Sequence, residues 1–84
     1  HDARLLVDID LAILGTEPAR FAEYDAQVRE EYGWVPGLIY RTKRREVLAG
    51  FLNRPAIFDT GWFRERFEVQ ARGNLVRAIR ALSG

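Results

Sequence analysis

Three short stretches rich in turn-forming residues divide this 84-residue chain into four segments with helical periodicity: Gly15–Thr16, Gly33–Gly37 and Pro55–Gly61. Glycine and proline end helices, because glycine relaxes the backbone and proline lacks the N–H that the next turn needs. Between the breaks apolar residues recur every three or four positions, and no segment alternates as a β-strand does. The sequence therefore predicts one all-α unit over residues 1–84, with about four helices and no sheet.

The first predicted helix runs from about Ala3 to Leu14, with Asp2 as its N-cap and Gly15 as its C-terminal stop. Its apolar residues go almost all the way round, which is typical of a helix that is buried on most sides. Three short partner helices offer too little apolar surface to cover it. We therefore expect part of this helix to remain exposed in a monomer and to drive association with another copy or a partner.

Each of the other three predicted helices carries one apolar stripe. Thr16 and Thr60 are the expected N-caps of the second and fourth helices, and the third helix runs from about Leu38 to Asn53 because Pro55 prevents its continuation. Gly73, inside the fourth helix, predicts a close helix crossing. The stripes comprise Phe21, Tyr24, Val28 and Tyr32 on the second helix, Val47, Leu48, Phe51 and Leu52 on the third, and Phe63, Phe67, Ala71, Leu75, Ile79 and Leu82 on the fourth.

Composition and charge argue against several classes of protein. The chain has no cysteine, so no disulfide framework is available and a cytoplasmic location is expected. Its apolar runs are far shorter than the roughly 20 residues of a membrane-spanning helix. The net charge of +1 does not favour nucleic-acid or membrane binding. Residues 1–42 hold four basic and eight acidic side chains whereas residues 43–84 hold nine and four, a polarity that could help the two halves pack together.

Two aspartates, Asp8 and Asp10, lie within the very apolar first helix. Residues two apart on a helix point about 200° apart, so the two carboxylates cannot both address one site. Arg4 lies one turn before Asp8 and offers it an ion pair. Asp10 has only apolar residues one turn away on either side, so it must be protonated, paired with a distant cation or bound to a metal. From spacing alone, a distant salt bridge and a metal or catalytic role both stay open for Asp10.

A basic run at residues 41–45 lies on the predicted third helix. Guanidinium groups match phosphate oxygens bidentately, so Arg41, Arg44 and Arg45 are candidate phosphate-binding residues. One alternative is that the run is an ordinary solvated helix face. Another is nucleic-acid binding through this run, which would be strongly salt-dependent. The adjacent His1–Asp2 pair is not taken as a metal site, because it lies at the chain end and His1 is the only histidine.

The chain resembles, over nearly its whole length, the C-terminal half of a bacterial group of predicted HD-type metal-dependent phosphohydrolases. The resemblance is carried, in order and spacing, by Leu6–Gly15 (LVDIDLAILG), Phe21–Tyr24 (FAEY), Val28–Tyr32 (VREEY), Tyr40–Arg41, Arg44–Leu48 (RREVL), Phe51–Leu52, Ile57–Phe58, Thr60 and Ala71–Leu75 (ARGNL).

HD enzymes are all-α and take their metal ligands from a His, a His-Asp pair and a later Asp on successive helices. By its position in the Asp-Ile-Asp-Leu block, Asp10 resembles this last ligand, and Asp8 is the second candidate. The resemblance implies a divalent ion (Mn²⁺, Mg²⁺ or similar) in the complete site and a nucleotide-like phosphate ester as substrate. Three of the four ligands are absent from this chain, so we expect it to bind no catalytic metal alone.

The leading hypothesis is therefore that residues 1–84 are the C-terminal part of a larger HD-type domain and are incomplete as a catalytic unit. The expected partners are the missing N-terminal HD half, in a longer chain or as a separate piece, or another copy of the chain. The alternative belongs to a different class: a non-enzymatic helical interaction or dimerisation module whose first helix packs on a partner. In both cases we expect a soluble, cytoplasmic protein with no membrane partner.

Overall fold

The computed structural model describes the backbone of residues 3–83 and the side chains of residues 7–83. These form four α-helices and one short 3₁₀-helix, in the order α1 (Ala3–Leu11), η1 (Ala12–Gly15), α2 (Pro18–Glu31), α3 (Gly37–Leu52) and α4 (Gly61–Ser83). The described part contains no strand, which confirms the all-α prediction, and the breaks fall in the three predicted stretches. The expected N-cap, Asp2, lies outside the described residues.

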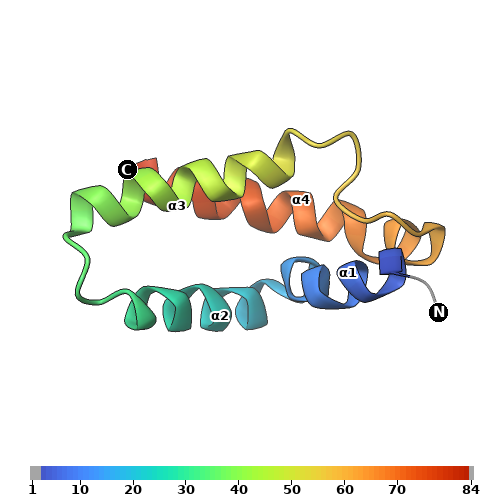
Figure 1. Ribbon diagram of the computed structural model, residues 1–84, viewed down its shortest axis with the longest axis horizontal. Coiled ribbons are helices and arrows are strands. Elements are labelled where there is room, and N and C mark those ends of the chain that lie inside the picture. Colours follow the sequence, from blue (N-terminus) through green and yellow to red (C-terminus); the bar gives the residue numbers. More distant parts are fainter. Residues whose placement is uncertain (1–2, 84) are drawn as a thin grey trace.

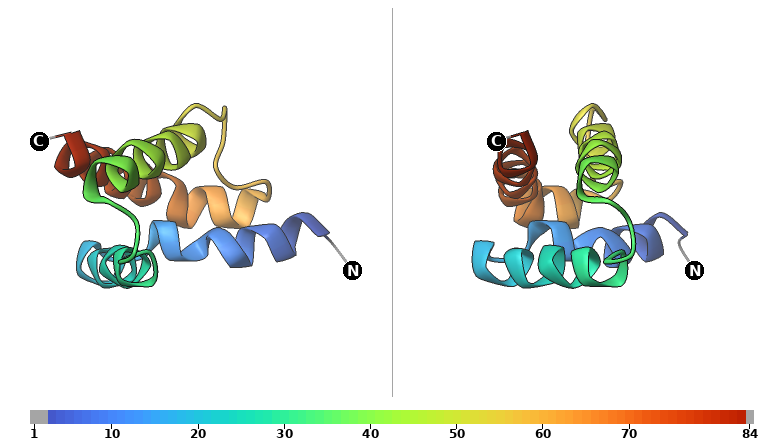
Figure 2. Two further views of the ribbon diagram at one scale, coloured as in Figure 1. Left: turned by 60° about the vertical axis from the view of Figure 1, so that its left-hand side comes forward. Right: turned by 90° about the vertical axis from the view of Figure 1, so that its left-hand side faces the viewer.

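The longest helix, α4, is the element on which the others assemble. α3 lies along α4, η1 packs against α4, and α2 is attached chiefly through η1. Figure 1 shows α3 and α4 together on one side, with α1 and α2 on the other. The left view of Figure 2 shows that α2 turns away from the line of α1, since α2 is seen end-on there and α1 is seen lengthwise. The result is an elongated molecule measuring 40 × 24 × 23 Å.

The hydrophobic core lies where η1, α3, α4 and the loop between α3 and α4 meet. The predicted α4 stripe is confirmed, because its residues are either buried or packed against the core. On α3, Leu48 is buried as predicted, whereas the prediction for Val47 is wrong. Val47 is 51% exposed because it faces α2 across a gap that no other helix covers. The buried core residues are Leu14, Phe21, Leu48, Ile57, Phe58, Phe63, Ala71, Leu75 and Ala78.

The close approach of η1 to α4 depends on Gly15. A Cβ at this position would lie 2.7 Å from the Cβ of Phe67 and 3.0 Å from the Phe67 carbonyl oxygen, distances that force one of the two elements to move. The predicted close crossing at Gly73 is wrong. The nearest atoms to a Cβ there belong to Arg77 of the same helix, at 3.4 Å. The tight helix contact is thus made by the glycine that ends the first helical segment.

A buried amide of α4 holds the end of this segment. Asn74 is 1% exposed, and its Nδ2 donates to the carbonyl oxygens of Leu14 and Thr16 at 2.9 and 2.8 Å. These carbonyls are among those that a helix end leaves without intrahelical partners. The N-cap prediction for Thr16 is wrong. Its hydroxyl donates to the Ile13 carbonyl oxygen at 2.7 Å, and Glu17 is the N-cap of α2.

Charged side chains of α4 hold the loop between α3 and α4. Glu68 accepts hydrogen bonds from the backbone N–H groups of Ile57 and Phe58, and Arg72 donates to Glu68 and to the carbonyl oxygen of Leu52. Ile57 and Phe58 are fully buried, so their backbone polar groups must find partners inside the protein. The loop is therefore a fixed part of the core, and this positions the residues that follow it.

Candidate functional site

Asp8 is fully buried between α1 and the start of α4. Its Oδ1 accepts a hydrogen bond from the backbone N–H of Asp59 at 2.8 Å. Its Oδ2 accepts from the backbone N–H of Thr60 at 2.8 Å and from the Thr60 hydroxyl at 2.7 Å. Thr60 directly precedes α4, as predicted for its N-cap, but its hydroxyl is directed to Asp8. The carboxylate of Asp8 thus joins α1 to the N-terminus of α4.

This hydrogen bonding keeps Asp8 ionised. Burial by itself raises the pKa of the Asp8 carboxyl, but the hydrogen bonds from Thr60 and Asp59 and the charge of Arg64 outweigh it and hold the pKa below its ordinary value. The sequence pointed to Arg4 as the partner of Asp8, and the side chain of Arg4 lies outside the described residues. The partners that the structure shows are Asp59 and Thr60, at the start of α4. Every helix N-terminus has backbone N–H groups without intrahelical acceptors, and this was the signal in the sequence that could have suggested them.

Asp10 lies on the outside of α1 and is exposed to solvent. The expectation that Asp8 and Asp10 face different ways is confirmed, since one is buried and the other is not. The expectation that Asp10 lies in apolar surroundings is wrong, because this side of α1 is not covered and Asp10 is exposed to solvent. The physical reason for giving Asp10 a distant cation or a metal is thereby lost. Its metal-binding role rests on the family resemblance alone.

The described residues contain no group of three or more His, Cys, Asp or Glu side chains that could hold a metal ion. A divalent metal needs several oxygen or nitrogen ligands, so Asp10 would supply only one of those required. The described part of the chain therefore does not form a metal site by itself.

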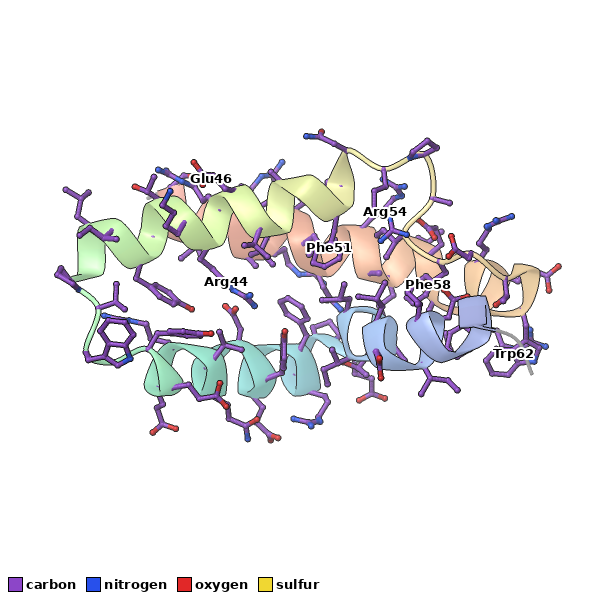
Figure 3. The ribbon with its side chains drawn as sticks, in the orientation of Figure 1. Arg44, Glu46, Phe51, Arg54, Phe58 and Trp62 are labelled. Carbon is purple, nitrogen blue, oxygen red and sulfur yellow. The ribbon has the colours of Figure 1, made fainter. Side chains whose placement is uncertain are left out.

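The structure separates the three arginines that the sequence grouped as phosphate ligands. Arg44 points from α3 toward α2 (Figure 3), where its Nη2 lies 3.0 Å from Oδ1 of Asp25. Arg41 and Arg45 face the C-terminal end of α4 and line a small pocket of about 440 Å³, in which Nη1 of Arg45 lies 3.5 Å from Oγ of Ser83. The described geometry does not bring the three guanidinium groups to one phosphate.

These arginines are also remote from Asp10. The N-terminal half of α3 lies at one end of the molecule and α1 at the other, in Figure 1 and in the left view of Figure 2. A small phosphate ester bound at Asp10 could not touch Arg41 or Arg45 of the same copy. The pair Arg44–Asp25 instead links the acidic first half of the chain to its basic second half, as the charge distribution suggested.

An open groove of about 830 Å³ runs between α2 and α3. Its apolar lining includes Val28, Tyr32, Trp34, Ile39 and Val47. Trp34 is 80% exposed, and Ile39 and Val47 are each about half exposed. Trp34 lies in the turn between the two helices, and its exposure marks this end of the groove as surface rather than core.

The contacts that join α2 to α3 beside the groove are polar and cation–π contacts. The guanidinium of Arg29 lies 4.4 Å from the ring centre of Tyr40, and that of Arg44 lies 5.7 Å from the ring centre of Tyr24. Burial would lower the pKa of Arg44, but its hydrogen bonds to Tyr24 and Asp25 raise it, so this cation stays charged. Burial raises the pKa of the Tyr40 hydroxyl, which stays neutral.

No helix in the described part is long and apolar enough to cross a membrane. Comparison of the chain with known protein families, with curated proteins and with solved structures finds no match.

Proposed function

We propose that this chain is the C-terminal helical part of an HD-type metal-dependent phosphohydrolase that acts on a phosphate ester. The ordered blocks of resemblance carry the proposal, and the contrast between the two aspartates decides which of them is available as a metal ligand. Both carboxylate oxygens of Asp8 already accept hydrogen bonds, from Asp59 and Thr60, whereas Asp10 is exposed on the same helix. Asp10 is therefore the carboxylate of the pair that can serve a metal held jointly with another part of the protein.

In a complete site, the divalent ion supplies activation of water for attack on the phosphate. Asp10 would contribute one anionic ligand to such an ion, and Asp8 fixes α1 to α4 so that Asp10 has a defined place. The other ligands, a His and a His-Asp pair, come from helices beyond this chain. Arg44 is committed to Asp25, and the position of Arg41 and Arg45 does not support a substrate contact within one copy.

The test begins with the gene sequence upstream of the codon for His1. A His and a His-Asp pair on predicted helices are expected there, and the protein expressed from the longer frame should hydrolyse nucleotides or p-nitrophenyl phosphate when Mn²⁺ is added. Asp10→Ala should abolish that hydrolysis, whereas Glu65→Ala, a change at an exposed carboxylate of α4, should not. An upstream frame without these ligands, or hydrolysis that survives Asp10→Ala, would overturn the proposal.

A second candidate function, a helical interaction module, is favoured by the groove between α2 and α3. Large apolar side chains that cluster around an open groove mark surfaces that other proteins cover. The groove should bind the apolar dye ANS, and Ile39→Asp should weaken dye binding more than Val69→Asp, a matched change at an exposed residue of α4 outside the groove. Equal dye binding by the two variants would refute this candidate.

A further inference from the structure

We propose that a second copy of this chain docks on the groove between α2 and α3 about a two-fold axis that runs along the groove. In this arrangement α2 of each copy lies on α3 of the other. The inference rests on the interaction-module candidate and names its partner, and it does not depend on the hydrolase proposal.

The first step is the apolar surface that one copy leaves open. Tyr32, Trp34, Ile39 and Val47 line one groove, and they are 47%, 80%, 52% and 51% exposed. Exposed aromatic and aliphatic side chains that gather in one place are typical of the centre of a protein interface. A complementary apolar surface that covers these four side chains removes apolar area from water, and this stabilises the complex.

The second step is that α2 and α3 of one copy do not close the groove. They meet through the ion pair of Arg44 with Asp25 and through the stacking of Arg29 on Tyr40. Figure 3 shows the Arg44 side chain reaching across the space between the two ribbons, while Glu46 points away from it. The apolar side chains beside these contacts therefore remain available to another pair of helices.

The third step is the charge of the two groove walls, which selects the occupant. Among the residues that line the groove, the one charged side chain of α2 is the acidic Glu31, whereas those of α3 are the basic Lys43 and Arg44. Rotation about an axis along the groove places the acidic α2 of one copy on the basic α3 of the other, in two equivalent places. Rotation about an axis across the groove would place α2 on α2 and α3 on α3, where like charges repel. A copy of the chain therefore complements its own groove in the first arrangement.

The fourth step is the register, which the contacts within one copy define. Asp25 of α2 contacts Arg44 of α3, and Arg29 of α2 contacts Tyr40 of α3. Gln27 lies midway between the two α2 residues. It is therefore level with Thr42 of α3 and with the adjacent Lys43. An axis along the groove preserves these levels between the two copies. Gln27 of one copy is then placed close to Lys43 of the other, and both residues line the groove.

The apolar part of the proposal is tested by sedimentation equilibrium of the 84-residue chain. The unmodified chain should form dimers, and Ile39→Asp and Val47→Asp should each raise the dissociation constant by about tenfold or more. Val69→Asp is the matched control. Its side chain is 87% exposed and lies outside the groove, so this variant should dimerise like the unmodified chain. Circular dichroism of each variant checks that the helices are retained.

The two-fold arrangement is tested by charge changes at surface positions, which leave the core untouched. Gln27→Lys should weaken dimers, because the introduced lysine repels Lys43 of the other copy at both symmetry-related places in the interface. Mixing the Gln27→Lys chain with a Lys43→Glu chain should give heterodimers in excess of both homodimers, because one Lys–Glu pair then forms across the interface. Glu30→Lys, an exposed change on α2 outside the groove, should show no such preference for the Lys43→Glu chain.

Three results would overturn the proposal. One is a chain that stays monomeric at high micromolar concentration. Another is a dimer that resists the Ile39 and Val47 changes but dissociates on Ile9→Glu, a change at an exposed residue of α1. The third is a mixture of the Gln27 and Lys43 variants without preferential pairing. The ANS comparison, made at dilution where the chain is monomeric, separates these failures from failure of the interaction-module candidate, because dye binding requires only an open apolar groove.

Discussion

The substitution Asp8→Asn tests the contact that joins α1 to α4. It removes the charge from a buried carboxylate that accepts three hydrogen bonds, from the two backbone N–H groups of Asp59 and Thr60 and from the Thr60 hydroxyl. The asparagine keeps one carbonyl oxygen but turns its NH₂ group toward a donor. Hydrogen bonds to charged groups contribute about 1.5–3 kcal/mol each, and an unpaired buried donor costs about 1–3 kcal/mol.

We therefore expect Asp8→Asn to lower the free energy of unfolding by about 2–4 kcal/mol. A chain of this length has a total stability of roughly 4–12 kcal/mol, and each kcal/mol lowers Tm by about 4–8 °C. The melting temperature, followed by circular dichroism at pH 7, should fall by roughly 10–25 °C. Thr60→Val removes only the hydroxyl donor to the charged carboxylate and should cost about 1.5–3 kcal/mol, so it remains informative if Asp8→Asn does not fold.

The control is Asp10→Asn on the same helix, which should change stability by less than about 0.5 kcal/mol because Asp10 is exposed. If the Asp8 and Asp10 variants melt at the same temperature, the carboxylate of Asp8 does not stabilise the fold as the structure indicates.

The pH dependence gives a second measurement on the same group. The pKa of Asp8 is lower in the folded chain than in the unfolded chain, so the stability it contributes is fully present above its ordinary pKa of about 3.9. That contribution is lost as the pH falls through the lower folded-state value. The difference in unfolding free energy between the unmodified chain and Asp8→Asn should accordingly shrink between about pH 5 and pH 2. A difference that stays constant over this range would show that the charge of Asp8 is not the source of the stabilisation.

Three further predictions concern activity, packing and the core. The purified 84-residue chain should show no phosphatase or nucleotidase activity with Mn²⁺ or Mg²⁺, and turnover that Asp10→Ala removes would contradict this. Gly15→Ala should destabilise the chain by about 1–3 kcal/mol in urea unfolding, because its Cβ would overlap α4. Gly50→Ala, with nothing within 4 Å of the new Cβ, should instead stabilise α3 by up to about 1 kcal/mol. If Gly50→Ala destabilised the chain more than Gly15→Ala, the close contact of Gly15 with α4 would be refuted. Leu75→Ala, in the fully buried part of α4, should cost about 2–5 kcal/mol, and a cost equal to that of the exposed Val69→Ala would place the core elsewhere.

Local sequence determined the helices of this protein. Proline and glycine act on their own backbone and that of the next turn, so the breaks near Gly15, Pro36 and Pro55 could be located without any tertiary contact. The stripe on α4 could be found for a similar reason, because a helix with apolar residues at regular spacing has one face that it must bury. The presence of four helices, and the face that α4 presents to the core, follow from these short-range rules.

The tertiary structure alone decided which carboxylate is buried and which glycine is crowded. Asp8 is satisfied by Asp59 and Thr60, residues about fifty positions further along the chain, so no inspection of its own helix could find them. Asp10 is exposed because no other element covers that side of α1, and Gly15 rather than Gly73 meets another helix. These properties depend on distances between segments remote in sequence, and the periodicity of one helix carries no information about what its neighbours leave uncovered. The groove between α2 and α3 has the same origin, since each wall is an ordinary helix face and only their separation makes a surface that a partner can cover.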